Sequence, residues 1–586
     1  MSRLLRTLAD IGPTRLQRRF RYELRQRLDR RLPPALALAF AGATGAMPSW
    51  RSLPTEIAPI DAPPGPKAPG LQAAITFKFL NDERCLPWPI RWNDPSWPRL
   101  WQFNLHYFDW ARQWLEQALS TGAWPAEATA LEPLIDHWIE ANPAGRGDGW
   151  HSYTLSLRTR NWIWLFLSCP NLATPARLQS FWQQLCWLQA HPEHCHGGNH
   201  WLENLTALAI GGLQFDGTQA AVMHRRALDL LQHELASQLL ADGGHEERSA
   251  GYHLLMLARL VELRSNLQAS STECPAWLVQ AIEAMSYWRE AVRLEAGGFP
   301  RFNDSVIENY QPPASTFSQA PLTDLASTGW TLIRPGHGWE LVFKCGVPCP
   351  RHLPPHAHSD LLSFDLFHHG LPVLAEAGTS VYGSGPDRLY ERSGAAHNLL
   401  QLGCIRGSQI HWIEPVEVWG GFRAGRKANP LDRACGQDEA GSFWVTGSHD
   451  GFQRFAASHR RRIELTAASE GLLLLSLSEQ ISCRRPMVWR QWWHLGPDLP
   501  VDFLNPLLQQ LDRFGLVDVS WHNTWLSTGF GQRRPRRSLC FSGQLPPGEH
   551  ELVQKLSLQP AQLLSSPLPA ASDAPSLAGK PVRQHP

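Results

Sequence analysis

The chain has 586 residues, more than one hydrophobic core usually supports, and two or more domains are expected. Its formal net charge of +1 excludes the strongly basic field of a general nucleic-acid-binding protein, so no nucleic-acid partner is expected. No apolar run reaches the roughly 18 residues of a transmembrane helix. The 11 cysteines are odd in number and scattered, which favours free thiols. The 27 tryptophans suit a core and also suit sugar binding, because sugar rings have apolar faces.

The first thirty residues have a basic amphipathic pattern. Leu16, Phe20, Leu24 and Leu28 repeat every four residues among arginines, which predicts a helix with one apolar face. We expect this helix to pack on its own domain or, alternatively, to contact an anionic membrane surface or a partner. Because no apolar run here is long enough for a signal-peptide core, a cytoplasmic location is expected, with export to the periplasm as the alternative.

Changes in composition divide the chain into four predicted parts. The basic helix and a proline-rich arm make up residues 1–70, and a helical domain follows at 71–315. A β domain is expected at 316–564. The tail at 565–586 is rich in proline, alanine and serine without a hydrophobic pattern, which predicts disorder.

Helical periodicity dominates from Trp101 to about Ala296, after a short predicted strand at 75–80. Short breaks of glycine, proline and asparagine separate the helices. Helices joined by such loops stack as hairpins in a solenoid or in a toroid, and the period alone does not separate these two. Beyond the segment at 101–110, the predicted helices span 131–141, 156–167, 175–190, 200–210, 218–240, 251–267 and 275–294.

Past Phe299 the pattern changes to short alternating apolar segments separated by turn residues. This spacing is typical of an antiparallel β-sandwich. The predicted strands lie at 331–334, 340–345, 361–367, 399–402, 443–446, 462–465, 472–477 and 487–493.

Two histidines, His356 and His358, precede the strand predicted at 361–367. Residues i and i+2 of a strand point the same way, so both imidazoles are expected to project together from the mouth of that strand. Imidazole is a good zinc ligand and changes its charge near neutral pH. The pair indicates a metal or catalytic role, although a His-x-His pattern by itself has little specificity.

Two loops of the helical part offer groups that could complete a site. Asn199 is a plausible helix cap, and His200 and Glu203 share one face of the helix that follows. A polar loop at 242–249 lies between two helices, and Tyr252 begins the second of them. Loops on rigid scaffolds often carry function, but helix capping and ordinary burial explain the same residues.

An earlier helix entrance, at 149–162, carries aromatic side chains and an arginine. Trp150 and Tyr153 precede Arg158, whose fork of donors suits a carboxylate. An arginine lying along the surface of its own helix explains the same pattern.

Six motifs together resemble the heparinase II/III family of polysaccharide lyases. They follow the family's order over roughly residues 75–500 and are split between the helical and the β part, a combination that is specific although no single motif is decisive. The motifs are Trp101…Asn104-Leu105-His106-Tyr107-Phe108-Asp109, Ser156-Leu157-Arg158…Asn161-Trp162, Asn199-His200…Glu203-Asn204, Asp242-Gly243-Gly244…Tyr252-His253, His356-Ala357-His358-Ser359-Asp360…Ser363-Phe364 and Ala396-His397-Asn398.

The resemblance implies a multidomain protein, an incomplete α/α toroid followed by an antiparallel β-sandwich, with the site in the cleft between them. Such enzymes cleave uronic-acid polysaccharides, glycosaminoglycans or alginate among them, by β-elimination. A base removes the proton alpha to the sugar carboxylate, and the 4-linked oxygen leaves. The carboxylate must be neutralised, and a base and an acid must come within reach. The implied partner is therefore an anionic polysaccharide, and no organic cofactor is expected.

The resemblance also implies residue roles. Asn199 and His356 would grip the sugar carboxylate, and His200 and Tyr252 would transfer the protons, with Tyr252 as the acid and a candidate base as well. Glu203 would orient a neighbouring group. The residues expected to contact the substrate are Tyr107, Trp150, Tyr153, Arg158, Arg248 and His253.

A structural zinc ion in the β domain is a further implication of the resemblance. His358, Glu376 and His397 occupy the positions of its ligands. Glutamate stands where the family usually has the aspartate of an Asp-Pro-Gly-Thr motif, and glutamate also binds zinc. A second tyrosine from the β domain is expected near the site, with Tyr382 and Tyr390 both as candidates.

Two other functions remain open from the residues alone. A glycoside hydrolase on a related toroid would need two carboxylates flanking the bond, for example Glu203 with Asp242 or Glu246. A non-catalytic carbohydrate-binding protein of capsule or exopolysaccharide assembly would bind a polymer without turnover.

Overall fold

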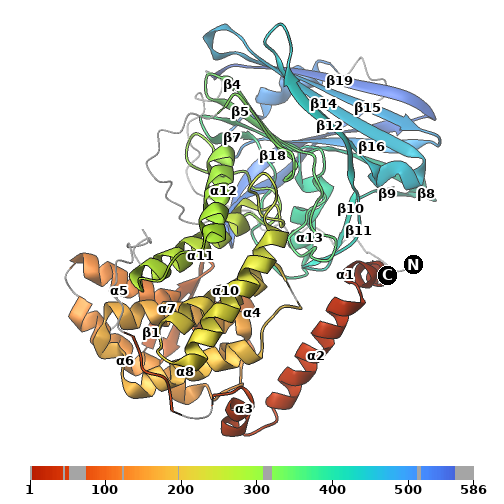
Figure 1. Ribbon diagram of the computed structural model, residues 1–586. Helices are drawn as coiled ribbons and strands as arrows, with labels where there is room; N and C mark the ends of the chain where they lie inside the picture. Colours follow the sequence, from red (N-terminus) through yellow and green to blue (C-terminus); the bar gives the residue numbers. More distant parts are fainter. Residues whose placement is uncertain are drawn as a thin grey trace.

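The computed structural model describes residues 3–43, 46–51, 74–121, 124–195, 197–307, 320–510 and 517–560. Helices form one half of the molecule and antiparallel sheets form the other, with the chain passing once from the first to the second (Figure 1). This order confirms the predicted fold class. The tail predicted at 565–586 and most of the proline-rich arm lie outside the described residues.

Three helices at the start of the chain run along one side of both halves (Figure 1). They are α1 (Arg3–Ile11), α2 (Pro13–Asp29) and α3 (Pro34–Phe40). In α1, Thr7 Oγ1 donates a 3.0 Å hydrogen bond to the carbonyl of Ala424 in the sheet half. In α2, the Tyr22 hydroxyl lies 3.3 Å from Ser152 Oγ in the helical half. None of the helices that the structure describes has the length and apolar character needed to cross a bilayer.

The helical half begins with a β-hairpin and continues with helices that pack as antiparallel neighbours. Its centre is α9, which contacts α7, α10 and α11. Many of the tryptophans are part of its hydrophobic core, and Trp114, Trp138 and Trp162 are fully buried there. The elements are β1 (Ala74–Phe79), β2 (Asp82–Pro87), α4 (Arg99–Tyr107), α5 (Asp109–Thr121), α6 (Trp124–Ala141), α7 (Ser152–Ser168), α8 (Pro175–Ala190), α9 (Gly198–Leu213), α10 (Thr218–Gln238), α11 (Ala250–Ala269) and α12 (Ala276–Val292).

The sheet half contains three five-stranded antiparallel sheets among the described residues, ordered β3-β4-β5-β6-β7, β12-β13-β14-β15-β19 and β17-β18-β16-β8-β9. Apolar side chains from all three meet in one core, with Phe343, Leu402 and Ile463 as examples. The strands of the first sheet are β3 (Leu322–Leu325), β4 (Trp330–Gly336), β5 (Trp339–Lys344), β6 (Phe364–His368) and β7 (Leu371–Leu374).

The longest strands lie in the other two sheets. β14 and β15 pair over eleven residues, from Ala457 opposite Cys483 to Ala467 opposite Leu473, and both alternate between buried and more exposed positions. The remaining elements are β8 (Leu400–Arg406), β9 (Gln409–Trp412), β10 (Val416–Trp419), β11 (Arg423–Lys427), β12 (Pro430–Gln437), β13 (Phe443–His449), β14 (Ala457–Ala467), β15 (Leu473–Cys483), β16 (Met487–His494), β17 (Val517–Gly529), β18 (Gln532–Leu545), β19 (Gly548–Leu558) and the short helix α13 (Pro386–Arg392).

The two histidines of the His-x-His motif do not stand at a strand mouth, and this part of the sequence prediction is wrong. β6 begins only at Phe364, because Leu362 has a φ of 64° and cannot belong to an extended strand. His356 and His358 lie in the preceding loop. They converge because both bond to the carboxylate of Asp304, at 2.8 and 2.9 Å. A shared partner, and not the pleat of a strand, brings the imidazoles together.

Candidate active site

The segment after α12 fastens the two halves together. Asn303 is fully buried, and its side-chain nitrogen donates to the carbonyls of Glu247 (3.1 Å) and Arg248 (3.0 Å) in the helical half. Its side-chain oxygen accepts a 2.8 Å hydrogen bond from Lys344 Nζ on β5. The polar loop between α10 and α11 is therefore held against the sheet half, and groups from both halves meet there.

Asp304 is the centre of this junction. Its buried carboxylate receives both imidazoles of the His-x-His motif and a bidentate pair of bonds from Arg388 of α13, at 2.5 and 2.6 Å. Burial alone would raise the pKa of Asp304, but the Arg388 cation and the histidine hydrogen bonds hold it well below its usual range. The sequence reasoning missed Asp304. The feature that could have indicated it is the Asn303-Asp304 pair, which lies in the segment between the part of the sequence with a helical pattern and the part with a strand pattern.

A tyrosine pair lies against His356. The Tyr252 ring packs on the imidazole with centroids 4.0 Å apart, and its hydroxyl is 2.9 Å from the hydroxyl of Tyr382. Burial raises the pKa of both tyrosines above the ordinary value, so both are protonated at neutral pH. The other candidate, Tyr390, packs on Trp525 instead, with centroids 4.8 Å apart. The structure therefore places Tyr382 at the site.

Glu247 connects Asn199 to His356. The Asn199 backbone N–H donates to Glu247 Oε1 (3.1 Å), and Glu247 Oε2 lies 3.3 Å from His356 Nε2. The predicted cap is wrong, because α9 begins at Gly198 and Gly197 is the cap residue. Both glycines have positive φ, 68° and 55°, which favours glycine at this entrance. The side-chain amide of Asn199 is buried and makes no hydrogen bond to any described residue.

His200 lies beside this network, in the first turn of α9. Its ring packs on Tyr153, with centroids 4.3 Å apart, and 39% of its side chain is exposed. Although burial lowers the pKa of His200, the Glu193 carboxylate 3.4 Å from Nδ1 raises it above the ordinary value overall. Tyr107 packs behind Tyr153 at 6.1 Å. These rings form an aromatic row next to Asn199.

Glu203 makes no hydrogen bond to His200 or Tyr252, although its charge contributes to the raised pKa of His200. It is fully buried and paired with Arg160 Nη1 (3.1 Å) and Arg259 Nε (2.7 Å). Asp242 is another carboxylate considered for hydrolysis. It accepts hydrogen bonds from the backbone N–H (2.6 Å) and the hydroxyl group (3.0 Å) of Thr328. Burial raises the pKa of Glu246 to about 8. Glu203 and Asp242 are thus both engaged by internal partners, which disfavours either of them as one of the two carboxylates of a hydrolase.

Four predicted substrate contacts lie elsewhere. Arg158 is fully buried over the Trp138 ring (3.8 Å) and donates to internal carbonyls and to Gln184, which compensates its desolvation. Trp150 bonds the Asn142 carbonyl inside the core, and His253 bonds the Met285 carbonyl while packing on Trp288. Arg248 donates to the carbonyls of Glu246 and Ser327 and so fastens the loop.

A second cluster adjoins Asp304 in the sheet half. His358, Asp360, Glu376 and His397 each offer a ligand atom, and all four atoms lie within 4.8 Å of one another. Three of these residues were expected as zinc ligands, and Asp360 is an addition from the structure. All four side chains are fully buried.

Each histidine of this cluster directs one ring nitrogen to a hydrogen-bond partner outside the four residues. His397 Nδ1 is 2.8 Å from the Ser393 carbonyl and His358 Nε2 is 2.9 Å from Asp304, so these nitrogens carry the hydrogens. The remaining nitrogens, His358 Nδ1 and His397 Nε2, are 3.3 Å apart, and His397 Nε2 also lies 3.0 Å from Glu376 Oε2. Asp360 Oδ1 and Glu376 Oε1 accept no hydrogen bond from any described residue. Such a concentration of buried acceptors fits a metal cation.

Two family models match almost consecutive parts of the chain. The Heparinase II/III N-terminus model matches residues 87–321, and the Heparinase II/III-like, C-terminal model matches residues 318–555. The chain belongs to the heparinase II/III family. The two matched regions overlap at residues 318–321, between the end of α12 and the start of β3.

Individual relatives of this heparinase II/III-family chain are distant. FtsZ-localized protein C of Caulobacter vibrioides is 22% identical over 421 residues, covering 68% of this chain and 70% of that protein. Heparin-sulfate lyase of Bacteroides stercoris is 22% identical over 388 residues, and the chain spans only about half of its length, 56%. A heparan sulfate lyase HepC mutant from Pedobacter heparinus has the same fold, with a TM-score of 0.57, 18% identity and coverage of 90% and 88% of the two chains.

Proposed function

We propose that this protein is a polysaccharide lyase that cleaves an anionic, uronic-acid-containing polysaccharide by β-elimination. The observation that carries the proposal is the Tyr252–Tyr382 hydroxyl pair packed against His356, since one connected group receives residues from both halves. The similarity to a protein named heparin-sulfate lyase supports the same class of substrate.

Asn199 and His356 are suited to hold the sugar carboxylate. The Asn199 side-chain amide has unused donors, and His356 is oriented by the 2.8 Å bond from Nδ1 to Asp304. Because Nδ1 is engaged by Asp304, Nε2 is the ring nitrogen left to face a bound carboxylate. Glu247 now lies at that nitrogen and also accepts from the Asn199 backbone, so a carboxylate fits between these two groups.

We assign proton transfer to Tyr252 and His200. Tyr252 is protonated at neutral pH and can protonate the leaving 4-linked oxygen, after which the Tyr382 hydroxyl can donate to the resulting phenolate. His200, half-exposed beside Asn199, is the candidate base for the proton at C5. Together these groups supply the three functions that β-elimination needs: neutralisation of the carboxylate, a base and an acid.

The first experiment is an ultraviolet absorbance assay with heparan sulfate, alginate, hyaluronan and glucuronan. We expect at least one polymer to give growing absorbance from the new conjugated double bond, together with new reducing ends. New reducing ends without absorbance would instead indicate hydrolysis. Binding of a polymer without either signal at any pH would indicate a carbohydrate-binding protein.

We further propose that His358, Asp360, Glu376 and His397 hold a divalent metal ion, zinc by the chemistry of the ligands. The ion would link the His356 loop to the segments after β7 and before β8, a structural role. Through the His358–Asp304 bond it would also keep His356 in place. No proton-transfer step involves the ion directly.

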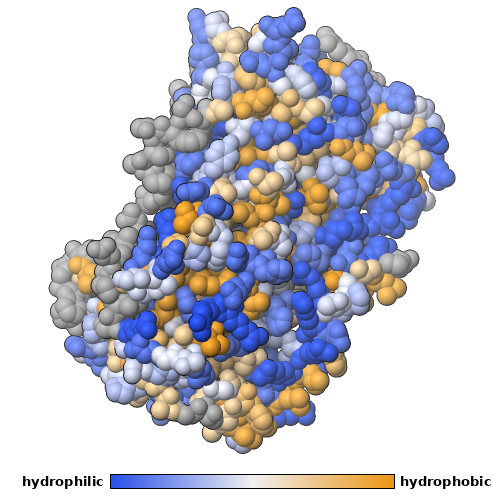
Figure 2. All heavy atoms as spheres, in the orientation of Figure 1, coloured by the Kyte–Doolittle hydropathy of each residue, from blue (hydrophilic) through white to orange (hydrophobic). Residues whose placement is uncertain are grey.

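We also propose that α2 contacts an anionic membrane surface. Phe20, Leu24 and Leu28 expose 67, 44 and 53% of their surface on one side of the helix, among exposed arginines. Figure 2 shows hydrophobic and hydrophilic surface interleaved along the edge where Figure 1 places α1 to α3. An exposed apolar stripe flanked by arginines is typical of helices that lie in the headgroup region of anionic lipids.

Vesicle sedimentation tests this contact. We expect the full chain to sediment with vesicles of phosphatidylserine and phosphatidylcholine but not with phosphatidylcholine alone, because arginine attraction is needed. A variant with Phe20→Ser, Leu24→Ser and Leu28→Ser should bind at least about tenfold more weakly, since each buried methylene contributes about 0.8 kcal/mol. Its melting temperature should be unchanged, because all three side chains are exposed. Equal sedimentation of both proteins would contradict the proposal.

A further inference from the structure

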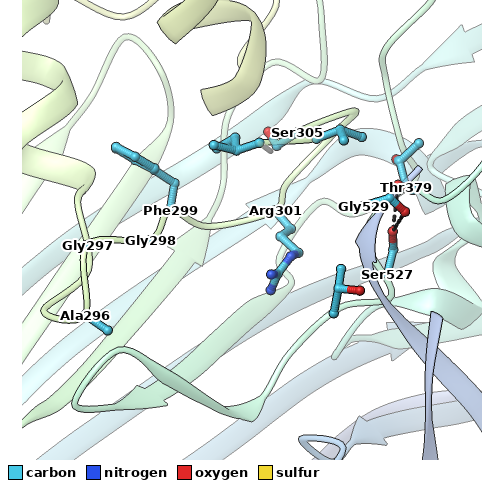
Figure 3. Close-up of a pocket in the computed structure, with 12 residues that line it drawn as sticks. Ala296, Gly297, Gly298, Phe299, Arg301, Ser305, Thr379, Ser527 and Gly529 are labelled. Carbon is cyan, nitrogen blue, oxygen red and sulfur yellow. Dashed lines mark hydrogen bonds between the residues drawn. The ribbon is translucent and has the colours of Figure 1, made fainter. Parts of the chain in front are cut away.

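A cavity separate from the tyrosine pair lies at the junction of the two halves. Its volume is about 300 Å³, at the lower end of the range for small-molecule sites. One wall is the turn after α12, from Ala296 to Phe299, and another is the end of β17 at Ser527 (Figure 3). Ser305 and Thr379 complete the lining near Asp304.

Arg301 projects into this cavity. Figure 3 shows its guanidinium in the space between the Ala296–Phe299 turn and Ser527. Among the described residues that line the cavity, Arg301 alone carries a charge, and it makes no hydrogen bond or ion pair with any described residue. The carboxylates of Asp365 and Glu376, which lie outside the lining, act on it only through their charge. Other buried arginines are compensated: Arg388 binds Asp304 and Arg461 binds Glu479. A partly buried guanidinium without a hydrogen-bond partner costs free energy, and an anion in the cavity would reduce that cost.

Three of the hydroxyl groups that line the cavity already donate hydrogen bonds within the protein. Ser527 Oγ donates to the Thr379 carbonyl (2.7 Å), Thr379 Oγ1 donates to Asp304 Oδ1 (3.0 Å), and Ser305 Oγ donates to the Phe302 carbonyl (2.7 Å). The N–H donors of the Arg301 guanidinium therefore have no hydrogen-bond acceptor among the described residues, and no carboxylate lines the cavity. That chemistry selects a group with two or more negatively charged oxygens.

The cavity is close to the reacting groups. Thr379 lines it and hydrogen-bonds the same Asp304 carboxylate that orients His356. Only two hydrogen bonds thus separate the cavity wall from the imidazole proposed to hold the sugar carboxylate. A polymer whose uronate lies at His356 could place a neighbouring sugar unit at Arg301.

We propose that the Arg301 cavity binds an oxyanion of the polymer, a sulfate ester or a carboxylate, on a sugar unit next to the one that is cleaved. This inference rests on the proposed lyase function. It makes Arg301 a residue that determines which anionic polymers are bound, and gives it no part in proton transfer.

Binding of inorganic sulfate tests the cavity without any turnover. We expect sulfate to raise the melting temperature of the full chain and of a control variant, Arg485→Gln, in the exposed turn between β15 and β16. Arg301→Gln should lose this response, and Arg301→Lys should keep part of it. An Arg301→Gln protein that responds like the wild type, or a wild type that does not respond, would overturn the anion site whatever the enzymatic activity.

Kinetics on two polymers that differ only in sulfation test the substrate assignment. On heparan sulfate, Arg301→Gln should raise KM about tenfold, as expected for one charge-assisted contact, with kcat within twofold. An equal increase on the unsulfated backbone identifies a carboxylate, and an increase confined to heparan sulfate identifies a sulfate. Unchanged KM on both polymers would overturn the assignment.

A second variant leaves Arg301 intact. A Cβ built on Gly298 meets no atom within 4 Å, so a side chain can be introduced in the cavity lining without a clash. Gly298→Glu should supply a competing carboxylate and raise KM as Arg301→Gln does, whereas Gly298→Gln should change it less. Equal effects of the two substitutions would contradict an electrostatic role for the cavity.

Discussion

Replacing Tyr252 with phenylalanine is expected to lower kcat on the cleaved polymer by about 10² to 10⁴-fold, the range for removal of a general acid. The substitution deletes one hydroxyl group and leaves the ring that packs on His356 at 4.0 Å. The hydrogen bond between the hydroxyl groups of Tyr252 and Tyr382 is lost at a cost of about 1 kcal/mol, so the fold should remain. Initial rates from ultraviolet absorbance at saturating polymer measure the effect.

Tyr390→Phe is the matched control. It makes the same chemical change on a buried tyrosine of the sheet half that packs on Trp525 and lies apart from the pair. Its kcat should stay within about twofold of the wild type, while Tyr382→Phe should fall between the two because it removes only the partner of Tyr252. Full activity of Tyr252→Phe on that polymer would exclude this residue as the acid.

Removal of the metal ion is expected to have the largest effect on stability. A ligand at a thousand times its Kd stabilises the folded state by about 4 kcal/mol. At roughly 2–4 °C per kcal/mol for a domain of this size, chelation should lower Tm by about 8–16 °C. Elemental analysis should find about one zinc ion per chain before chelation. A protein without bound metal, whose Tm is indifferent to a chelator, would contradict the site.

Two histidine variants separate loss of the metal from loss of a buried side chain. His397→Ala removes a proposed ligand, so the variant should contain little zinc and show no further change with chelator. His459→Ala removes a buried imidazole that pairs with Glu479 on neighbouring β15 and is not one of the four proposed ligands. It should lose stability yet keep both its zinc and its response to chelation.

Local sequence patterns predicted the helices and strands well where capping and periodicity agreed. The helix predicted at 175–190 has those same ends in the structure, because Thr174 caps it and Pro175 suits its first turn. The helix predicted from His200 starts earlier, at Gly198, because positive-φ glycines turn the chain there. Such a turn depends on what surrounds it, so the pattern around Asn199 indicated a helix start without its exact residue.

Periodicity did not indicate which helix face lines a cleft. Arg158 and His253 belong to motifs that resemble those of the family, yet both side chains lie in the core of the helical half. Helices of a toroid pack on two sides, so a polar residue on either face can be a satisfied internal group. The contacts that distinguish Tyr382 from Tyr390 are likewise made by residues more than a hundred positions away.

The sequence by itself determined the order of elements, the division into a helical and a sheet half, and the family, because these depend on periodicity and on motifs read along the chain. Only the tertiary structure decided that Asp304 joins His356 to His358 and that Glu247 links Asn199 to His356. It also decided that Asp360 completes the acceptor cluster and that Arg301 makes no hydrogen bond with any described residue. The physical reason is that hydrogen bonding and desolvation of buried charges depend on neighbours brought from distant segments. Those neighbours are set by packing and have no signature in local sequence.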